Sequence, residues 1–599
     1  MNSSTFYDFV IIGGGTSGLV VANRLSEDPR YNVLVIEAGS DHTADPRVQI
    51  PALFDTLKNT ELDWNFKSKP QPALGGRIIN VNQGKALGGS SAINASVFVP
   101  PTKSLIDSWE TLGNHGWNWD ILQPYLSKAY TSPPPVDAQS SKSLGIDKWA
   151  TLNDAAKGPI QTSFPASFTD PVRELWADTF AAENHLMPTD PFVNPSVGSF
   201  SCLSSIHPET KERSYSASAY YRPVQDRKNL HILTNAEVVK ILFDKTKSGR
   251  PIRASGVQYK HEGTSSMVYS SKEVILAAGA LQSPKVLELS GIGDANLLQK
   301  LSIDVVLDLP AVGENLQDHS VGSICFEATD ALDTFDALMR QEPEATAQAM
   351  QDYTANQTGP MSHVGVTAYA YLPVRSREGR QAVQDKLHDN RPHLGEGVSC
   401  SRDSAYFTVT ERALLDPSEP TAAYLTFTAQ TAESAGWTKR SPPGPLPGRF
   451  LTIGAMLSQP LSRGTVHIQS NDHSVPPVID PRYLSNPIDM EVLAQHMLEI
   501  DSIARTSSFS KLLKQPLRHG DPASHFTDVE EAKQYLRDRV ISMWHVGCTC
   551  VMLPRTKGGV VDTDLKVYGV ENLRVVDASA LPIISTANLQ ATVALWSPG

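Results

Sequence analysis

His545 and Asn588, near the end of this 599-residue chain, flank a segment that could place them beside a ligand. The segment Leu573 to Val576 is apolar and predicts a short strand, with Asp577 at its carboxyl end. Ligands of open α/β sheets lie at that end. A histidine there could accept a proton, because its ordinary pKa is about 6.5. Spacing alone favours a histidine that is simply packed in the core or in a loop.

The other end of the chain carries a glycine motif that indicates which kind of ligand such a site would bind. The apolar segment Asp8 to Ile12 leads into Gly13-x-Gly15-x-x-Gly18, and an apolar helical pattern follows. Gly13 permits the turn, Gly15 lets the backbone approach a pyrophosphate, and Gly18 lets helix and strand pack closely. The free N–H groups at the helix start face the phosphates. The expected cofactor contacts here are Gly13, Gly15, Thr16, Ser17 and Gly18.

A second apolar segment, Val33 to Ile36, ends at Glu37. An acid at this distance from the glycines can hydrogen-bond a ribose hydroxyl. The two strands, the helix and the acid together predict a dinucleotide-binding unit. They do not identify the dinucleotide.

Composition excludes several classes of function. The net charge of −12 and the absence of a basic run argue against a nucleic-acid partner. No apolar segment reaches about 18 residues, so we expect no transmembrane helix and no membrane partner. The first strand begins a few residues after Met1, which leaves no room for a signal peptide and predicts a cytoplasmic protein or a processed form.

The five cysteines are odd in number and scattered, without the spacing of metal ligands, so we expect mostly buried thiols and no metal site. They are Cys202, Cys325, Cys400, Cys548 and Cys550.

A second glycine-rich stretch, Gly84 to Asn94, allows two readings. Small residues in series let a backbone lie against a flat ring or a phosphate. The same stretch could be a glycine turn with a serine N-cap.

The remaining patterns predict two sheets. The segment Lys272 to Ala280 is a buried strand that could return to the first sheet beside the nucleotide. Short strands and a strand pair precede it, at 231–233, 238–243 and 255–269. Residues 320–540 indicate a second, mainly antiparallel sheet with strands at 323–328, 366–372, 424–429, 450–457 and 465–468, flanked by helices near 341–355, 380–388 and 488–506. Single helical regions are expected at 101–130 and 170–186, and a long loop from Ser434 to Gly448.

Five motifs, in order, resemble the glucose–methanol–choline (GMC) family of flavin oxidoreductases. The resemblance covers the whole chain, thinly in 130–215 and 330–450. The motifs are Arg77 with Gly84 to Asn94, Gly279 to Gly293, Val312 to His319, His545 with Gly547 to Cys550, and Asp577 to Ser579.

The resemblance implies an α/β (overall α+β) fold in which a Rossmann-like FAD-binding domain carries a discontinuous, mainly antiparallel substrate domain with flanking helices. The FAD-binding parts would be 1–165, 215–319 and 541–599, and the substrate-binding parts 166–214 and 320–540. Glu37 would hold the adenosine ribose and the backbone at Val238 would meet the adenine. The other implied FAD contacts are Ala38, Trp64, Ser91, Asn94, Ala95, Ser96, Val97, Asp577, Ala578, Gln590 and Ala591.

The resemblance also implies the chemistry. His545 matches the active-site histidine of the family and Asn588 its second His-or-Asn position. A primary or secondary alcohol would give its proton to His545 and its hydride to flavin N5, while Asn588 orients the oxygen. Oxygen or another acceptor would reoxidise the flavin. Trp544 would pack beside the substrate, although plain core packing explains it equally well.

Departures from the family pattern refine these expectations. Ile93 stands where some relatives tether the flavin through histidine, so FAD should be non-covalent. Ala95 is small and leaves space for a bulky or aromatic substrate. Phe98 to Pro101 resembles a subset of fungal members, and the segment 595–599 predicts a short last helix.

Parts of the sequence are also compatible with two other functions. A family member could keep FAD as a structural element and catalyse a non-redox cyclisation or dehydration in secondary metabolism. Retention of His545 weakens that reading. The first glycine motif alone would also allow a nicotinamide dehydrogenase, but the four later motifs argue against it.

Overall fold

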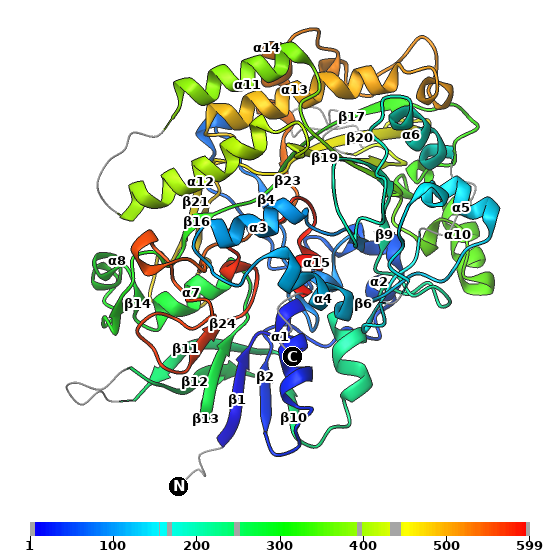
Figure 1. Cartoon of the computed structure of the whole chain (residues 1–599). Helices are drawn as coiled ribbons and strands as arrows, with labels where there is room; N and C mark the ends of the chain where they lie inside the picture. Colours follow the sequence, from blue (N-terminus) through cyan, green and yellow to red (C-terminus); the bar gives the residue numbers. More distant parts are fainter. Residues whose placement is uncertain are drawn as a thin grey trace.

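The computed structural model describes residues 6–154, 156–164, 171–244, 252–391, 398–431 and 445–594, with side chains of 398–400 left out. Within these residues there are two large sheets, which lie in different parts of the molecule (Figure 1). The first lies at the bottom of the view and the second at the top, beneath three helices. The C-terminal segment, drawn in red, runs between them. The mixed α/β architecture expected from the sequence is confirmed.

The first sheet has a parallel half and an antiparallel half. Strands β1, β2 and β13 carry buried Val, Ile and Leu side chains on both faces, as parallel sheets do. The parallel strands, in order, are β10 (Leu230–Leu233), β2 (Val33–Ile36), β1 (Phe6–Ile12), β13 (Thr264–Leu276) and β24 (Leu573–Val575). The antiparallel strands are β12 (Ala254–His261) and β11 (Ala236–Phe243).

Strand β13 joins the two halves. The sequence separates it into the end of one pattern at residue 269 and a new strand from residue 272. In the structure it is continuous: it pairs with β12 up to Tyr269 and with β1 from Tyr269 onwards. The change of partner explains the two patterns, because the polar residues between them lie where one pairing ends and the other begins. The predicted return of this strand to the first sheet is confirmed.

The second sheet is antiparallel throughout its six strands. Helix α13 packs on β17 and β20, and helices α11 and α14 pack against α13 (Figure 1). The strands are β23 (Ile541–Ser542), β17 (Ser320–Glu327), β20 (Phe450–Leu457), β19 (Ala422–Phe427), β18 (Ala368–Leu372) and β8 (Gly198–Ser201). The helices are α11 (Arg377–Asp389), α13 (Pro487–Ala504) and α14 (Val529–Arg539).

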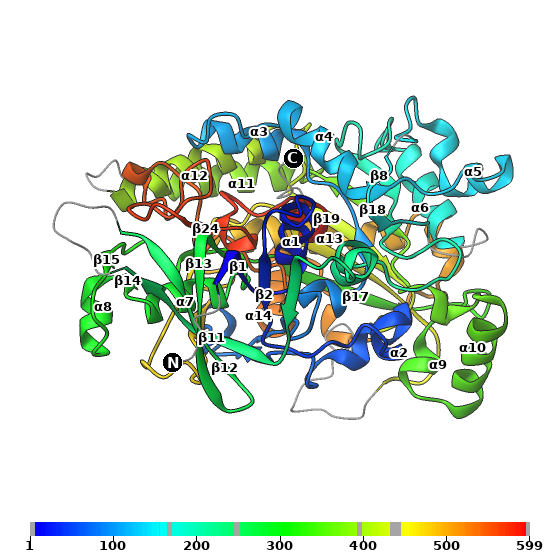
Figure 2. The same ribbon diagram turned by 90° about the horizontal axis from the view of Figure 1, so that it is seen from below.

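Two expectations about this region were wrong. The strand expected at 465–468, β21 (Gly464–His467), belongs to a separate small sheet with β16 (Glu314–Leu316) and β22 (Val478–Asp480). Helix α10 (Pro343–Asn356) does not flank the large sheet; its buried face packs on Ile50 and Met361, near α2 (Pro46–Gln49) (Figure 2). An amphipathic pattern shows that a helix has a buried face but not which element covers it.

The single helical region expected at 101–130 is two helices, because Gly113 and Gly116 between them have φ angles of +113° and +84°.

The long helix α12 (Val398–Leu415) was missed, and most of the loop expected at 434–448 lies outside the described residues, as does segment 595–599. The other helices are α1 (Thr16–Leu25), α2 (Pro46–Gln49), α3 (Lys103–Thr111), α4 (Trp119–Ala129), α5 (Ala138–Leu144), α6 (Pro171–Ala181), α7 (Gln282–Leu289), α8 (Ala295–Lys300), α9 (Asp336–Met339) and α15 (Leu589–Val593).

Cys202, Cys325, Cys548 and Cys550 are buried thiols, as expected, and the side chain of Cys400 is not described. In the part of the chain that the structure describes, no helix is both long enough and apolar enough to span a bilayer.

Candidate active site

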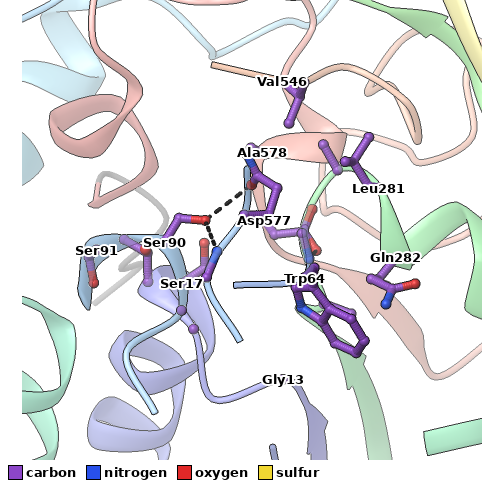
Figure 3. Close-up of a pocket in the computed structure, with 18 of the residues that line it drawn as sticks. Gly13, Ser17, Trp64, Ser90, Ser91, Leu281, Gln282, Val546, Asp577 and Ala578 are labelled. Carbon is purple, nitrogen blue, oxygen red and sulfur yellow. Dashed lines mark hydrogen bonds between the residues drawn. The ribbon is translucent and has the colours of Figure 1, made fainter. Parts of the chain in front are cut away.

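One large cavity opens at the carboxyl ends of the parallel strands of the first sheet. Gly13 follows β1, Glu37 follows β2, Ala277 follows β13 and Asp577 comes two residues after β24; all four line the cavity. This is where open α/β sheets bind ligands. Figure 3 shows side chains from the first glycine loop, the second glycine-rich stretch and the C-terminal segment around this one space.

The two glycine-rich stretches pack against each other at one end of the cavity. Helix α1 begins after Gly15 without a side-chain cap and without an acid in its first turn, so its N–H groups remain free for an anion. A Cβ atom on Gly89 would lie 2.8 Å from the Cα of Gly15. Gly84, Gly89, Ser90 and Ser91 line the cavity, so the second stretch is part of its wall.

Three buried polar atoms in the cavity wall lack a partner among the described residues. They are Oγ of Ser17, Oε1 of Gln282 and Nε1 of Trp544. Buried polar groups are almost always hydrogen-bonded, so these atoms fit a polar ligand that contributes the missing partners. A dinucleotide offers phosphate oxygens, hydroxyls and ring atoms along the length of such a cavity. The residues present therefore fit FAD.

Glu37 is held rigidly at the cavity edge. Its carboxylate accepts hydrogen bonds from the backbone N–H groups of Gly14 and Gly39, each at 2.7 Å. Burial raises the pKa of Glu37 to about 7, although both hydrogen bonds and the charge of Lys85 oppose that rise. Because a carboxylate has further lone pairs, Glu37 can still accept a hydrogen bond from a ligand hydroxyl.

Most of the residues expected to contact cofactor or substrate line this cavity. They are Gly13, Gly15, Thr16, Ser17, Glu37, Ala38, Trp64, Ser91, Asn94, Ala95, Val97, Val238, Trp544, His545, Asp577, Ala578, Asn588 and Gln590.

Three of the expected residues lie outside the cavity lining. A Cβ on Gly18 would lie 2.0 Å from the carbonyl oxygen of Gly13, so this glycine serves the packing of α1 on β1. The hydroxyl of Ser96 is turned away and accepts a hydrogen bond from Arg213 at 2.9 Å. Ala591 is buried in the core on α15.

His545 is positioned by Asp318 and by a second histidine. The carboxylate of Asp318 accepts a hydrogen bond from the backbone N–H of His545 at 2.8 Å. Nδ1 of His545 lies 2.9 Å from Nδ1 of His319, and the two rings are nearly perpendicular. Nε2 of His319 lies 3.3 Å from the carbonyl oxygen of Ser458.

These contacts determine which nitrogen of His545 is free. A carbonyl oxygen only accepts hydrogen bonds, so Nε2 of His319 carries its proton and Nδ1 of His319 has the lone pair. That lone pair must accept a proton from Nδ1 of His545. Nε2 of His545 is then unprotonated and has no hydrogen-bond partner among the described residues. His545 thus offers a proton acceptor to the cavity.

Burial keeps both rings neutral. It lowers the pKa of His319 to about 4. It also lowers the pKa of His545 well below the ordinary value, and the repulsion between the two rings when both are protonated acts in the same direction. A neutral imidazole is the form that can act as a base.

Asn588 is oriented by Tyr369 of β18. The hydroxyl of Tyr369 donates to Oδ1 of Asn588 at 2.7 Å. The amide oxygen is therefore occupied, and the Nδ2 hydrogens of Asn588, which have no partner among the described residues, are available as donors. The cavity wall thus combines a proton acceptor at His545 with a hydrogen-bond donor at Asn588.

No role was expected for His319 from the sequence, and Tyr369 was not singled out. His319 was visible as the last residue of a family motif, next to Asp318. Tyr369 carries no local signal, because it meets Asn588 only through the pairing of the second sheet.

Trp544 lines the cavity next to His545, and the ammonium of Lys58 lies 4.4 Å from the centre of its ring.

The two glycines of the first loop should respond differently to alanine. Gly15 has a φ of −84°, and a Cβ there would come no closer than 3.7 Å to other protein atoms outside its immediate neighbours. We expect Gly15→Ala to leave the melting temperature of the apoprotein unchanged and to weaken FAD binding about tenfold or more, because the methyl group fills ligand space. Titration with FAD and thermal melting of the apoprotein measure the two effects.

Gly13→Ala is the matched comparison. Gly13 has a φ of +103°, and its Cβ would lie 2.4 Å from the carbonyl oxygen of Ala277. We expect this variant to destabilise the apoprotein itself, by about 2 kcal/mol or more. Equal effects of the two variants on apoprotein stability would contradict this division of roles.

Comparison with known proteins agrees with the geometry. The GMC oxidoreductase family models match residues 7–321 and 460–596. The chain is 34% identical to the GMC oxidoreductase family protein Mala s 12 of Malassezia sympodialis, over 98% of this chain and 90% of that protein. The structure is similar to that of an FAD-dependent oxidoreductase from Chaetomium thermophilum, with a TM-score of 0.85, 30% identity and coverage of 99% and 97% of the two chains. It is also similar to a fungal aryl-alcohol oxidase, with a TM-score of 0.81, 28% identity and coverage of 100% and 98%.

The resemblance inferred from the five motifs is confirmed. The use of FAD, a small-molecule substrate and an electron acceptor follow from this membership. The chain is an FAD-dependent member of the GMC oxidoreductase family.

Proposed function

We propose that the protein oxidises a primary or secondary alcohol to a carbonyl compound. The observation that carries the proposal is the contact between Nδ1 of His545 and Nδ1 of His319, which leaves Nε2 of His545 as a proton acceptor. Asn588, whose amide oxygen is occupied by Tyr369, lines the same cavity. A cavity that contains both a proton acceptor and a hydrogen-bond donor suits an alcohol, which loses a proton from an oxygen that the donor then stabilises.

The chain's own residues divide the work as follows. His545 takes up the hydroxyl proton at Nε2. Asn588 donates an Nδ2 hydrogen to the same oxygen and holds it as negative charge develops. FAD, when bound, supplies the acceptor for the carbinol hydride at N5. Ser17 and the N-terminal turn of α1 would hold the pyrophosphate, and Glu37 a ribose hydroxyl.

The walls near His545 indicate a bulky, largely apolar substrate. Phe54, Met543 and Trp544 line this part of the cavity, and Ala95 is too small to restrict it. Aromatic side chains bury large apolar area and stack with rings. We therefore propose an aromatic alcohol or a similarly bulky compound as the substrate.

The proposal is tested by mixing the purified holoenzyme with a panel of aromatic and aliphatic alcohols without oxygen. Loss of the oxidised flavin absorption band with formation of the matching carbonyl product is the expected result. Release of a cyclised or dehydrated product with the flavin still oxidised would replace the proposal with non-redox catalysis. Readmission of oxygen then shows whether oxygen is the electron acceptor.

FAD should be held without a covalent bond. Ile93 lines the cavity at the position where a tether would form, and its side chain contains only carbon and hydrogen. We expect acid precipitation to release all of the FAD into the supernatant, as measured by its absorption. Flavin that remains with the precipitated protein would contradict this expectation.

Flavin reduction should be independent of pH above about pH 6.5. The pKa of His545 is lowered, so the base is already neutral at pH 6.5 and the rate falls only as the pH drops through the lowered pKa. Asp318, whose buried carboxyl has a pKa raised to about 6, also becomes protonated in the acid range. Stopped-flow reduction between pH 5 and 9 measures this profile; a rate that falls as the pH decreases from 9 to 6.5 would contradict a base that is neutral throughout that range.

A further inference from the structure

Arg213 is a buried arginine behind the cavity wall. Only 3% of its surface is exposed. Its Nε donates to the carbonyl oxygen of Val48 at 2.9 Å. Its Nη1 donates to the carbonyl oxygen of Asn94 at 2.5 Å and to Oδ1 of Asn94 and Oγ of Ser96, each at 2.9 Å.

The charge of Arg213 has no counterion in the described part of the chain. No carboxylate there lies within ion-pair distance of its guanidinium, and Nη2 is buried without a hydrogen-bond partner. Burial lowers the pKa of Arg213 to about 10, and only Tyr215 opposes that effect. A buried charge without a partner is costly, yet at this pKa the group stays protonated at neutral pH. The other buried cation near the cavity, Lys285, has Glu237 at 3.9 Å.

A chain of hydrogen bonds connects Arg213 to the cavity. Oδ1 of Asn94 accepts from Arg213, and Nδ2 of Asn94 donates to Oε1 of Gln590 at 2.8 Å. Asn94 and Gln590 both line the cavity, from opposite ends of the sequence. Hydrogen bonds in series polarise one another, so the positive charge of Arg213 raises the electrostatic potential at the cavity surface.

We propose that Arg213 supplies the positive charge that stabilises the reduced flavin, acting through Asn94 and Gln590. Oxidation of an alcohol releases a hydride and a proton. The hydride carries two electrons to the flavin ring, which gains one negative charge, while the proton goes to His545. Arg213 is a positioning residue in this scheme, because it touches the wall of the site and not the reacting atoms. The proposal rests on the proposed alcohol oxidation for its purpose, but its test needs no alcohol.

The test measures the two-electron midpoint potential and the affinity of the bound oxidised flavin for sulfite, which adds to the ring and leaves a negative charge on it. We expect Arg213→Gln, which keeps a hydrogen-bond donor but removes the charge, to weaken sulfite binding about tenfold and to lower the potential by the equivalent ~30 mV. Arg213→Lys keeps the charge and should restore most of both quantities. Because neither measurement uses His545, failure of the proposed alcohol chemistry would leave this result intact.

Arg463→Gln is the matched control. The guanidinium of Arg463 is also buried, and its carbon lies 4.8 Å from the centre of the Tyr406 ring. Neither residue lines the cavity. This control should leave the potential and the sulfite affinity unchanged. An Arg213→Gln enzyme with wild-type potential and sulfite affinity would overturn the proposal. So would a loss of FAD affinity alone, which would assign the charge to the pyrophosphate, or a failure of both Arg213 variants to hold FAD, which would make the residue structural.

Discussion

His545→Ala is expected to lower the rate constant of flavin reduction by an alcohol by about 10²- to 10⁴-fold, the usual contribution of a positioned general base. The size of the loss follows from the geometry. Nε2 of His545 is the unprotonated nitrogen in a cavity that Asn588 also lines, and Asn588 can donate a hydrogen bond but cannot accept a proton through its nitrogen. Stopped-flow reduction without oxygen, at saturating alcohol, measures the effect.

The reduction rates of His545→Ala and wild type can be compared only if the variant keeps its FAD. His545 is partly exposed to the cavity and its backbone is held by Asp318, so the alanine variant should fold and retain FAD, as shown by the flavin spectrum. His231→Ala, at an exposed position on strand β10, is the matched control and should reduce at the wild-type rate. A His545→Ala enzyme that holds FAD and reduces as fast as wild type would remove His545 from the chemistry.

The cofactor half of the site could be predicted from sequence because its signals are local. Gly13, Gly15 and Glu37 lie within one strand–helix–strand unit, where each residue type answers a local requirement of the backbone or the ligand. Gly18 shows the limit of this reasoning: it belongs to the motif, but it contacts the loop of Gly13 and not the cavity.

The residues that orient the chemistry could not be predicted in this way. Arg213 meets Asn94 across 119 residues, Tyr369 meets Asn588 across 219 and His319 meets His545 across 226. None of these pairs has a period or spacing that a single sequence displays. They arise because the second sheet and the C-terminal segment are folded onto the same cavity.

Burial patterns were also insufficient to choose partners in the second sheet. Strand β21 has the alternating burial of a strand with one covered face, yet it pairs with β16 and β22 and not with the large sheet. Helix α10 has a buried face that is covered by the segment around Ile50. Periodicity reports that one face is buried, whereas the covering element is decided by the tertiary arrangement.

His319 should control the tautomer of His545, and a matched pair of variants tests this. Asn places an oxygen close to the position of Nδ1 of His319, whereas Leu has nearly the same shape as Asn and offers no acceptor. We expect His319→Leu to lower the rate constant of flavin reduction by about 10²- to 10³-fold and His319→Asn to lower it by less than about tenfold. Loss of the group that fixes the tautomer of a catalytic histidine costs up to about 10⁴-fold in serine proteases.

The physical reason lies in the proton on His545. Without an acceptor at position 319, a proton on Nδ1 of His545 would be buried and unpaired, which costs about 1–3 kcal/mol. The ring then favours the other tautomer, in which Nε2 carries the proton and cannot accept one from an alcohol. A merely structural role of His319 would instead lower FAD content or stability in both variants alike. Equal reduction rates in the Leu and Asn variants, with FAD retained in both, would therefore show that the contact at 2.9 Å does not determine which nitrogen of His545 acts as the base.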